Sequence, residues 1–427
     1  MATASYVPLR GTVSDWGDST GNRVDRFLAC VAYLDGVRPS LVMCRGYYAR
    51  TALTAWDWRA GQLIQRWAFD TGSSGGTWSA YKGQGNHNLS VGDVDGDGKD
   101  EIVYGACAID DNGTGLYTTG LNHGDAMHMS DMLPDRPGLE VWDVHETASI
   151  AGAGELRDAG TGALIWGWVG TGDTGRGCAA HIDSRYKGYQ FWSSSMRGTY
   201  DTTNTQISAN QPGYGNFLAW WDGDLQREIV DIAGSNGGPK IDKWSGNGVY
   251  RLLSVYSWPS SSYGCNSING TKGNPCLSAD ILGDWREELI YRLSDNTGLI
   301  ICTTTTATSY RFYSFMHDPQ YRCAIAWQNV AYNQPPHPSF YVGTGMSALP
   351  TPDIKLVGDT SGTVLCEWWT GITGTTVSNL TSNVNYPDNP GGHEYLMRLE
   401  GPVNWTDNYG TRVRGYVIPL QTGAYTF

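Results

Sequence analysis

The sequence predicts an all-β protein in which a β-propeller is followed by a partial β-sandwich-like segment. The first reason is composition. Glycine makes up 56 of 427 residues, against about 7% of the residues in average proteins. Charged residues make up only 17%, against about a quarter. The second reason is an aromatic content of 12%, which excludes a disordered chain. The third is an internal repeat of short strands and acidic turns. Together these observations favour strands and turns over long helices.

The repeat is clearest in residues 89–105, which read LSVGDVDGDGKDEIVYG. A short apolar run, an acidic loop and a β-branched run indicate two strands joined by a turn. Related copies begin at Phe27, Met127, Cys178, Phe217 and Leu277. The six copies lie roughly 40 to 60 residues apart and each is followed by further strand-like runs, which is the period of a four-stranded propeller blade and too long for a β-solenoid.

The repeats end before a change in composition near residue 348. We expect a propeller over residues 1–348, a linker over residues 349–361, where strand signals are sparse, and a separate segment over residues 362–427. That last segment contains GTVLCEWWTGITGTTVSNLTSNVNYP and DNYGTRVRGYVIPLQTGAYTF. These stretches resemble the start of a protective-antigen-type β-sandwich module, a carbohydrate-associated domain. Its length indicates an incomplete copy of such a module.

Charge and hydropathy exclude two kinds of partner. The net charge of −13, with only 29 lysines and arginines, argues against nucleic acid, since phosphate binding needs a basic surface. No apolar run approaches the roughly 18 residues that a membrane helix needs. The first residues carry no secretion-signal pattern, so a signal, if the protein has one, is not expected in this chain. A monomer is expected.

The nine cysteines form no metal-binding CxxC pattern, and their odd number leaves at least one thiol without a partner in the chain. Cys265 and Cys276 flank a glycine- and asparagine-rich segment that a disulfide would pin. Cys30 and Cys44 fall on neighbouring predicted strands and form a second candidate pair. Such bonds would imply an oxidising compartment. Buried free thiols are the alternative.

Acidic loops inside the repeats predict calcium sites. Asp93, Asp95, Asp97 and Glu101 place carboxylates at alternate positions around two glycines, and calcium prefers six to eight oxygen ligands. Solvated turns chosen for their backbone shape are the alternative. The pattern recurs in part in three other repeats, at Asp131, Asp135 and Glu140, at Asp222, Asp224 and Glu228, and at Asp280, Asp284 and Glu288.

Histidine is scarce, and its placement suggests a second kind of metal site. His87, His123, Asp125 and Glu146 all fall just outside predicted blade strands, where propeller loops gather near the central axis. Imidazole together with carboxylate favours zinc, manganese or iron. A single histidine of this kind is usually a hydrogen-bonded structural residue, but four candidate ligands in adjacent loops favour a metal.

Two basic residues in loops are candidates for chemistry. Arg176 lies in the glycine-rich segment GTGDTGRGC, where its forked guanidinium suits a carboxylate. Lys272 lies in SINGTKGNPC, between Cys265 and Cys276. A surface arginine and a solvated lysine are the alternatives.

Sugar contacts are expected from the loop that carries Lys272 and from one aromatic side chain. Asn269, Gly270 and Thr271 offer donors to sugar hydroxyls, although the same residues also suit an ordinary turn. Tyr332 follows a predicted strand and precedes two prolines, which places it on a rigid loop. A packed core aromatic is the alternative.

Six long motifs lie between about Tyr6 and Gly345. They are GQGNHNLSVGDVDGDGKDEIVYG, DDNGTGLYTTGLNHGDAMHMSD, RPGLEVWDVHE, GDTGRGCAA, LSADILGDWREE and MHDPQYRCAIAWQNVAYNQPPHPSFY. These motifs resemble the rhamnogalacturonan lyases of polysaccharide lyase family eleven. The resemblance implies a calcium-rich, eight-bladed propeller that acts on the alternating rhamnose and galacturonate backbone of pectin, outside the cell. Six blades are recognisable here, so the family's first two blades and its N-terminal β domain are expected to be missing.

The resemblance also implies roles for the candidate residues. It implies a calcium ion near the substrate held by His87, His123, Asp125 and Glu146. It implies sugar contacts from Asn269, Gly270, Thr271 and Tyr332, with Lys272 and Arg176 nearest the chemistry. Two imidazole ligands are unusual for calcium, so manganese or zinc stays an alternative at this site.

The implied reaction is β-elimination, in which the proton on C5 of galacturonate is removed and the bond to O4 breaks. A cation on the uronate carboxylate neutralises the charge that makes this proton a poor acid. Lys272, its pKa lowered by a nearby ion, would act as base near pH 8, with Arg176 on the carboxylate or the leaving oxygen. Which of the two is the base stays open here. The rivals are a hydrolase, a non-catalytic calcium-stabilised carbohydrate-binding propeller, and an inactive fragment.

Overall fold

The computed structural model describes residues 3–72, 76–213, 215, 217–233, 238–257, 264–269, 272–328, 330, 332–352, 364–396, 399, 401–402 and 405–415. The chain divides into two compact units, Met1–Pro352 and Asp353–Phe427. Each unit is described by itself.

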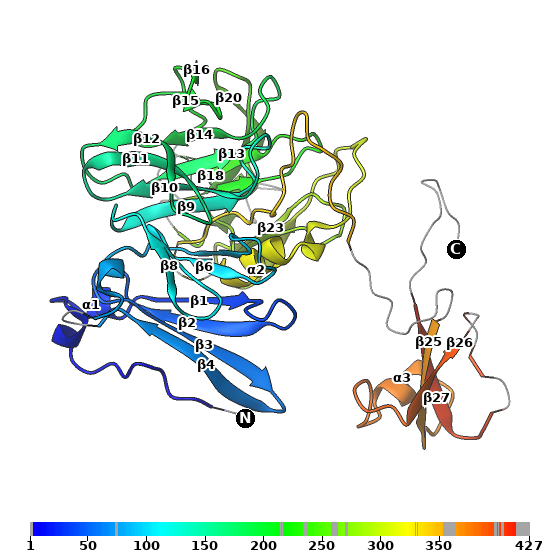
Figure 1. The fold of residues 1–427 in the computed structure, drawn as a ribbon. Helices are drawn as coiled ribbons and strands as arrows, with labels where there is room; N and C mark the ends of the chain where they lie inside the picture. The colour runs from blue at the N-terminus through cyan, green and yellow to red at the C-terminus, as the bar shows by residue number, and fades with distance from the viewer. Residues whose placement is uncertain are drawn as a thin grey trace. The chain divides into compact units, whose positions relative to one another are not determined.

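The first unit consists of antiparallel sheets that follow one another along the chain (Figure 1). Five of them have four strands joined in simple order. They are β1 (Phe27–Ala32), β2 (Ser40–Arg45), β3 (Ala52–Arg59) and β4 (Gln62–Asp70); β5 (Ser90–Gly92), β6 (Glu101–Val103), β7 (Cys107–Ile109) and β8 (Gly115–Thr118); β9 (Gly124–Ser130), β10 (Glu140–His145), β11 (Ser149–Asp158) and β12 (Leu164–Gly170); β13 (Gly177–Ala180), β14 (Gln190–Ser193), β15 (Thr199–Tyr200) and β16 (Gln206–Ser208); and β17 (Phe217–Ala219), β18 (Glu228–Ile232), β19 (Pro239–Trp244) and β20 (Val249–Leu253).

A sixth sheet departs from this simple order. Its central strand β23 (Glu288–Leu293) pairs with β22 (Leu277–Ala279), with β24 (Leu299–Cys302) and, at its far end, with the short β21 (Cys265–Asn266). The strand before β22 in the chain, β21, therefore belongs to the same sheet. The loop that carries Lys272 connects β21 to β22.

The repeat found in the sequence is confirmed as a structural unit. Each of its six copies forms an antiparallel pair, β1 with β2, β5 with β6, β9 with β10, β13 with β14, β17 with β18 and β22 with β23. The acidic segment of each copy is the connection between the two strands. The all-β fold class is therefore confirmed, and the closed propeller ring stays a prediction.

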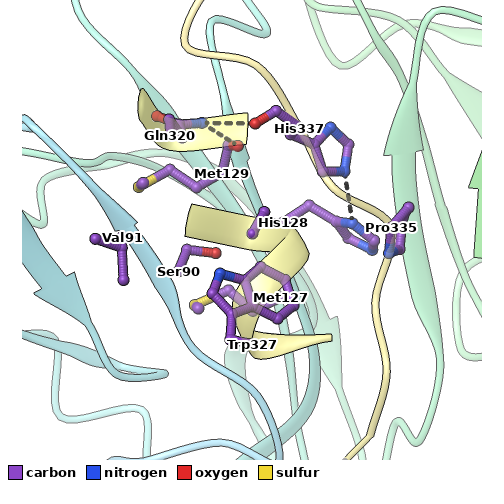
Figure 2. A pocket seen from close by; sticks show the side chains of 10 residues that line it. Ser90, Val91, Met127, His128, Met129, Gln320, Trp327, Pro335 and His337 are labelled. Atoms are coloured by element: carbon purple, nitrogen blue, oxygen red, sulfur yellow. Dashed lines mark hydrogen bonds between the residues drawn. The ribbon is translucent and has the colours of Figure 1, made fainter. Parts of the chain in front are cut away.

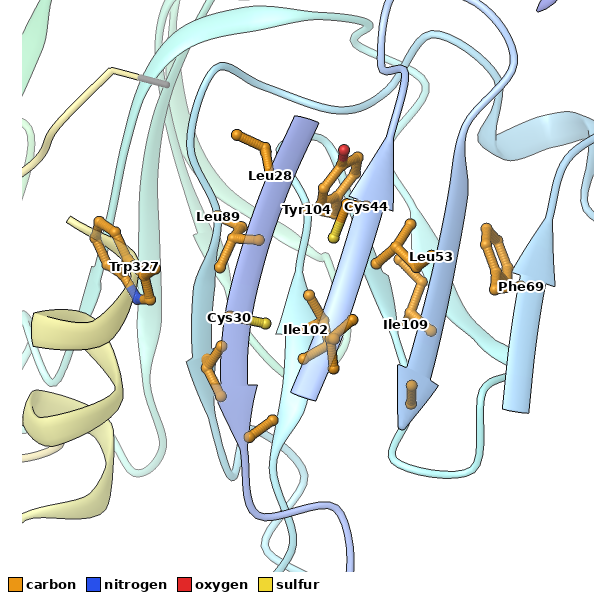
Figure 3. Close-up of a cluster of buried hydrophobic side chains, with 14 of the residues drawn as sticks. Leu28, Cys30, Cys44, Leu53, Phe69, Leu89, Ile102, Tyr104, Ile109 and Trp327 are labelled. Carbon is orange, nitrogen blue, oxygen red and sulfur yellow. The ribbon is translucent and has the colours of Figure 1, made fainter. Parts of the chain in front are cut away.

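Successive sheets bury their faces against each other. Leu28 and Cys44 of the first sheet pack with Ile102 and Tyr104 of the second in one core cluster (Figure 3). Further clusters join the second sheet to the third, the third to the fourth, the fourth to the fifth and the fifth to the sixth. Because both faces of these strands are covered, their sequences are apolar runs without strict alternation.

The one longer helix of the described first unit, α2 (Pro319–Trp327), lies against β1, β5 and β22 and so links the last sheet to the first two. Asp318 caps it by accepting a hydrogen bond from the Tyr321 amide, and proline suits its first turn. Gln320 on this helix donates to the carbonyl oxygen of Met129 (Figure 2). The remaining helical segments are single turns, η1 (Val13–Trp16), α1 (Gly21–Val24), η2 (Ser79–Tyr81), η4 (Val255–Ser257) and η5 (Phe315–His317).

Both predicted disulfides are wrong, since Cys30, Cys44 and Cys265 are free thiols. Cys30 lies on β1 and Cys44 on β2, as expected, but Cys30 stands opposite Val42 and Cys44 opposite Leu28. The two thiols are therefore offset along the pair and pack as small apolar side chains. Cys265 is buried and Cys276 is partly exposed, and neither supports the expectation of an oxidising compartment.

The second unit contains a small sheet of order β26-β25-β27. Its strands are β25 (Val364–Thr370), β26 (Gly392–Leu396) and β27 (Tyr409–Arg414), and a short helix α3 (Val377–Thr381) accompanies them. The carboxylate of Glu367 on β25 pairs with Arg412 and Arg414 on β27. The relation of this unit to protective-antigen-type modules stays a prediction, and most of the expected linker, residues 349–361, lies outside the described residues.

Candidate active site

His87, His123, Asp125 and Glu146 converge in the first unit, with one ligand atom of each lying within 4.8 Å of the others. His87 precedes β5, His123 and Asp125 flank the first residue of β9, and Glu146 follows β10. The pairing of β9 with β10 shifts register between Val144 and His145. Glycine at position 124 allows the start of β9 to lie this close to the backbone of β10, because a side chain there would overlap the carbonyl oxygen of Val144.

The two imidazoles are held through one nitrogen and turn the other toward carboxylates. His87 Nδ1 lies 2.8 Å from the Tyr47 hydroxyl, and its Nε2 lies 3.0 Å from Asp125 Oδ1. His123 Nδ1 contacts the carbonyl oxygen of Gly85, and its Nε2 lies 3.3 Å from Glu146 Oε1. Anchoring of the outer nitrogen in this way is typical of histidines that ligate metals.

These contacts test whether a cation fits. The Gly85 carbonyl only accepts, so the Nδ1 of His123 carries the proton and its Nε2 presents a lone pair in the neutral ring. Nε2 then faces the oxygen of Glu146, which is also an acceptor. Within the described residues, neither His123 Nε2 nor Asp125 Oδ1 has a well-formed hydrogen bond, although both are buried. A positive ion among these four residues satisfies acceptors that otherwise repel one another.

Burial lowers the pKa of His87, against the opposing effect of Asp125. The imidazole is therefore neutral at pH 7 and able to donate a lone pair. Two nitrogens and two carboxylates suit manganese or zinc as well as calcium, so the donor set fits a divalent cation without selecting one.

Lys272, Tyr332 and His87 form a continuous stack beside the cluster. The Lys272 ammonium nitrogen lies 4.4 Å from the centre of the Tyr332 ring, and that ring lies 4.1 Å from the His87 ring in a stacked arrangement. Lys272 is only 4% exposed. Burial, followed by the nearby Arg176 guanidinium, lowers the pKa of Lys272 to about 8.

The loop before Lys272 is held by its own backbone. The carbonyl oxygen of Asn269 accepts hydrogen bonds from the Lys272 amide and from the Ser267 hydroxyl. Gly270 and Thr271, expected to contact sugar, lie outside the described residues. Arg176 is anchored through its carbonyl oxygen, which accepts from the Ser194 amide.

Three residues of the site were not identified from the sequence. The Tyr48 hydroxyl lies 3.1 Å from His87 Nε2, and Tyr47 anchors the other nitrogen of that ring. Burial raises the pKa of Asp173, and the carboxylates of Asp125 and Glu146 add to the rise, which places Asp173 beside the cluster. The signals were present in GYYAR, where paired tyrosines end a strand, and in GDTGRG, where Asp173 precedes Arg176 by three residues.

The acidic loop after β5 gathers its carboxylates as expected. Asp93, Asp95 and Glu101 form one potential metal-ligand group, and Asp97 joins Glu101 and Asp111 in another. Burial raises the pKa of Glu101 to about 8, and the carboxylates of Asp95 and Asp93 add to this rise. Bound calcium at this loop stays a prediction.

The loop between β17 and β18 gathers Asp222, Asp224 and Glu228 into a potential metal-ligand group, as expected, and a lysine side chain lies among them. The Lys243 ammonium lies 2.5 Å from Asp222, 2.7 Å from Asp224 and 2.9 Å from Glu228. Basic side chains also pair with carboxylates in the two other loops that repeat the acidic pattern in part. Arg136 pairs with Glu140, and Arg286 pairs with Asp284. These loops thus contain a cation that the chain itself supplies.

Comparison with known proteins shows the family to which the first unit belongs. The profile of a family described as rhamnogalacturonan lyase family 11, C-terminal domain, matches residues 1–352. A rhamnogalacturonan exolyase, YesX, of Bacillus subtilis (strain 168) is 54% identical over 84% of this chain and 59% of its own length. A rhamnogalacturonan endolyase, YesW, of the same organism is 52% identical over 83% of this chain and 55% of its own length.

Solved structures give the same result. The crystal structure of YesW superposes with a TM-score of 0.76 at 50% identity, covering 82% of this chain and 58% of that one. The Bacillus licheniformis rhamnogalacturonan lyase PL11 superposes with a TM-score of 0.76 at 52% identity, covering 83% and 58%.

The fold of the first unit is that of the C-terminal domain found in a family of polysaccharide lyases. The chain belongs to rhamnogalacturonan lyase family 11, as the sequence motifs predicted. It spans between half and two thirds of the length of the curated relatives that it matches. Among the described residues, no helix is both long and apolar enough to cross a membrane.

Proposed function

We propose that the first unit cleaves the rhamnose–galacturonate backbone of rhamnogalacturonan by β-elimination, with a divalent cation held by His87, His123, Asp125 and Glu146. The observation that carries the proposal is the buried Lys272, whose pKa is lowered to about 8, beside a cluster whose acceptors fit a cation. The names of two relatives, an exolyase and an endolyase acting on rhamnogalacturonan, support the substrate class.

A cation bound at the cluster would supply neutralisation of the uronate carboxylate, which makes the C5 proton more acidic. Lys272 accepts that proton in its neutral form, which its lowered pKa makes abundant at mildly alkaline pH. A guanidinium donates five hydrogen bonds and has no acceptor, so Arg176 suits the carboxylate or the leaving oxygen better than the role of base. Tyr332 holds Lys272 over its ring and excludes water from one side of the ammonium.

The decisive experiment measures the ultraviolet absorbance of rhamnogalacturonan incubated with the whole chain, with and without EDTA. Elimination creates a double bond conjugated to the carboxylate, and absorbance should rise only when metal is present. New reducing ends without absorbance would show hydrolysis instead. Binding of polymer without any product would show a non-catalytic propeller.

The proposal includes calcium as the first candidate ion, with manganese or zinc as alternatives at the histidine cluster. It also includes an extracellular location, because the polymer lies outside cells and no part of the mechanism needs a cytoplasmic cofactor. Titration of the EDTA-treated protein with each ion, followed by the absorbance assay, identifies which ion restores the activity.

A further inference from the structure

A cavity of about 550 Å³ shares part of its wall with the cation cluster. His123 and Glu146 line it, together with Tyr48, Asn122 and Thr147. Its volume lies within the range of roughly 300 to 1,000 Å³ that is usual for ligand sites. The cavity is therefore large enough for a further part of a substrate that is bound at the cluster.

The charges on the cavity wall balance one another. Arg50 on this wall donates to the Asp70 carboxylate through two hydrogen bonds of 2.8 and 2.5 Å. Lys82, also on the wall, interacts electrostatically with the same carboxylate, and Glu146 adds a second negative charge. A divalent cation would add two positive charges, which Asp125 and the carboxylate of a bound galacturonate offset. With no surplus of either sign, the cavity suits a neutral group better than a second uronate.

The proposed substrate has a neutral unit next to each charged one. Its backbone alternates rhamnose with galacturonate, so both units bonded to a galacturonate at the cluster are rhamnose. Rhamnose carries hydroxyl groups and a methyl group but no charge. Its hydroxyls need hydrogen-bonding partners on the wall, since burying a polar group without a partner costs free energy.

Asn122 and Thr147 supply such partners. The side-chain oxygen of Asn122 accepts a hydrogen bond of 3.1 Å from the Gln84 side chain, which fixes the orientation of the amide. The nitrogen of the same amide donates no hydrogen bond within the described part of the chain, so its N–H groups can bind a ligand. The Thr147 hydroxyl donates to the carbonyl oxygen of Leu121 at 3.1 Å and keeps its lone pairs to accept. A donor and an acceptor on one wall match the hydroxyl groups of a sugar.

The backbone of Asn122 is held in an uncommon conformation. Its φ is +67°, in the left-handed region that asparagine tolerates better than most residues. Its amide donates to the Gln84 side chain at 3.1 Å, and its carbonyl oxygen lies 3.0 Å from His145 Nδ1. Non-glycine residues held in this region are concentrated at ligand sites. These contacts fix the donor before a ligand binds, which lowers the entropic cost of binding.

We propose that this cavity is a rhamnose-binding subsite, in which the Asn122 side-chain amide donates to a hydroxyl of the rhamnose bonded to the galacturonate at the cation cluster. The inference rests on the proposed function, because it takes that polymer as the substrate. It makes Asn122 a specificity-determining residue, since a polymer of galacturonate alone would place a charged unit in the cavity.

The test is calorimetric titration of the calcium-loaded full chain, in a Lys272→Ala background that prevents turnover. The probes are galacturonic acid, digalacturonic acid and the two disaccharides that join galacturonate to rhamnose, one for each order of the units. We expect one rhamnose disaccharide to bind more tightly than galacturonic acid, and digalacturonic acid to bind no more tightly. Asn122→Gly should weaken binding of that disaccharide about three- to tenfold, as loss of one neutral hydrogen bond does, and leave binding of galacturonic acid unchanged.

Glycine is chosen at position 122 because it adopts a positive φ without strain. Asn296→Gly is the matched control. Asn296 also has a left-handed backbone, with a φ of +62°, and its side-chain oxygen also accepts a hydrogen bond, from Arg292, but it lies between β23 and β24. The subsite is overturned by an equal loss in both variants, by no loss in Asn122→Gly, by a matching loss for galacturonic acid, or by rhamnose disaccharides that bind no more tightly than digalacturonic acid.

The absorbance assay of the parent chain reports separately on the proposed function. Elimination without a selective effect of Asn122→Gly rejects only the subsite. A selective effect of Asn122→Gly without elimination rejects only the lyase reaction.

Discussion

At the scale of single residues, the proposed elimination depends on the protonation state of Lys272. Because its pKa lies at about 8, the rate of elimination should rise with pH through this value as the neutral amine accumulates. We expect Lys272→Ala to lose at least about a hundredfold in kcat with little change in KM, since a base acts in the transition state. Lys272→Arg should not restore the rate, because a guanidinium stays protonated. An arginine variant with most of the parent rate would assign the base elsewhere.

Burial of the protonated Lys272 side chain should lower the free energy of unfolding. Its pKa in the folded chain is below the value of about 10.4 in an unfolded chain, so the unfolded state binds more protons between pH 8 and that value. Stability contributed by this group therefore rises with pH across that window and is lowest below pH 8. We expect Lys272→Met to gain more in Tm, relative to the parent, at pH 7 than at pH 10. A gain independent of pH would point to packing instead.

The histidines of the cluster should affect ion binding more than folding. His123→Ala removes a lone pair that faces Glu146, so calorimetry should show that the cluster no longer takes up its divalent cation, and elimination should stop. His393→Ala, at an exposed position of β26, is the control and should bind and react as the parent does. Unchanged ion uptake in His123→Ala would exclude this residue as a ligand.

At the scale of elements, a buried polar network fixes the loops that carry the cluster. The Asn86 side chain accepts from the Gly124 amide at 2.8 Å and donates to Asp143 at 2.6 Å. Asp143 in turn meets Arg157, which also binds Glu155. One amide therefore ties the loop before β5 to the first residue of β9.

We expect Asn86→Ala to weaken divalent-ion binding about 10- to 100-fold, the usual effect of losing a partner that orients ligands. Calorimetric titration with the ion measures this directly. Asn210→Ala serves as the control, because it removes an asparagine amide whose partner, Asn247, lies in another loop. Equal ion affinity in Asn86→Ala and the parent would show that the network supports only folding.

A second element, the loop between β17 and β18, should be independent of calcium until its lysine is removed. Lys243→Met leaves the carboxylates of Asp222, Asp224 and Glu228 facing one another, which should cost about 3 to 5 kcal/mol. Melting curves with and without calcium test the assignment. Calcium should raise the Tm of the variant more than that of the parent. An equal rise in both would mean that the loop does not accept a metal in place of the ammonium.

The sheets were predictable because each repeat is local: its two strands and the acidic connection lie within about 17 residues, as in residues 89–105. Local patterns do not fix partners from distant loops. Lys243 therefore remained unidentified as the partner of Asp222, and Tyr48 as a neighbour of His87. The disulfide predicted between Cys30 and Cys44 was wrong for a related reason, because adjacency of two strands does not give their register. Most site residues were assigned through the family resemblance rather than through spacing alone.

At the scale of the whole molecule, chelation should act on stability as well as on activity. If Asp93, Asp95 and Glu101 hold calcium, EDTA leaves clustered carboxylates without a counter-charge, and a ligand of the folded state is lost. We expect the melting temperature to fall by about 5 °C or more in EDTA and to recover when calcium is restored. A melting curve that is unchanged in excess EDTA would refute calcium at this loop.

The ammonium of Lys243 differs from a bound metal in one further respect. An ion taken from solution occupies its site according to mass action, so its contribution follows the composition of the medium and vanishes on dilution. A tethered ammonium has a fixed local concentration that neither dilution nor a chelator alters. The fifth sheet therefore keeps its counter-charge when a chelator is present. At the second sheet Lys99 supplies a tethered ammonium only to Asp97 and Asp111, so calcium bound by Asp93, Asp95 and Glu101 would follow the supply of ions in the medium.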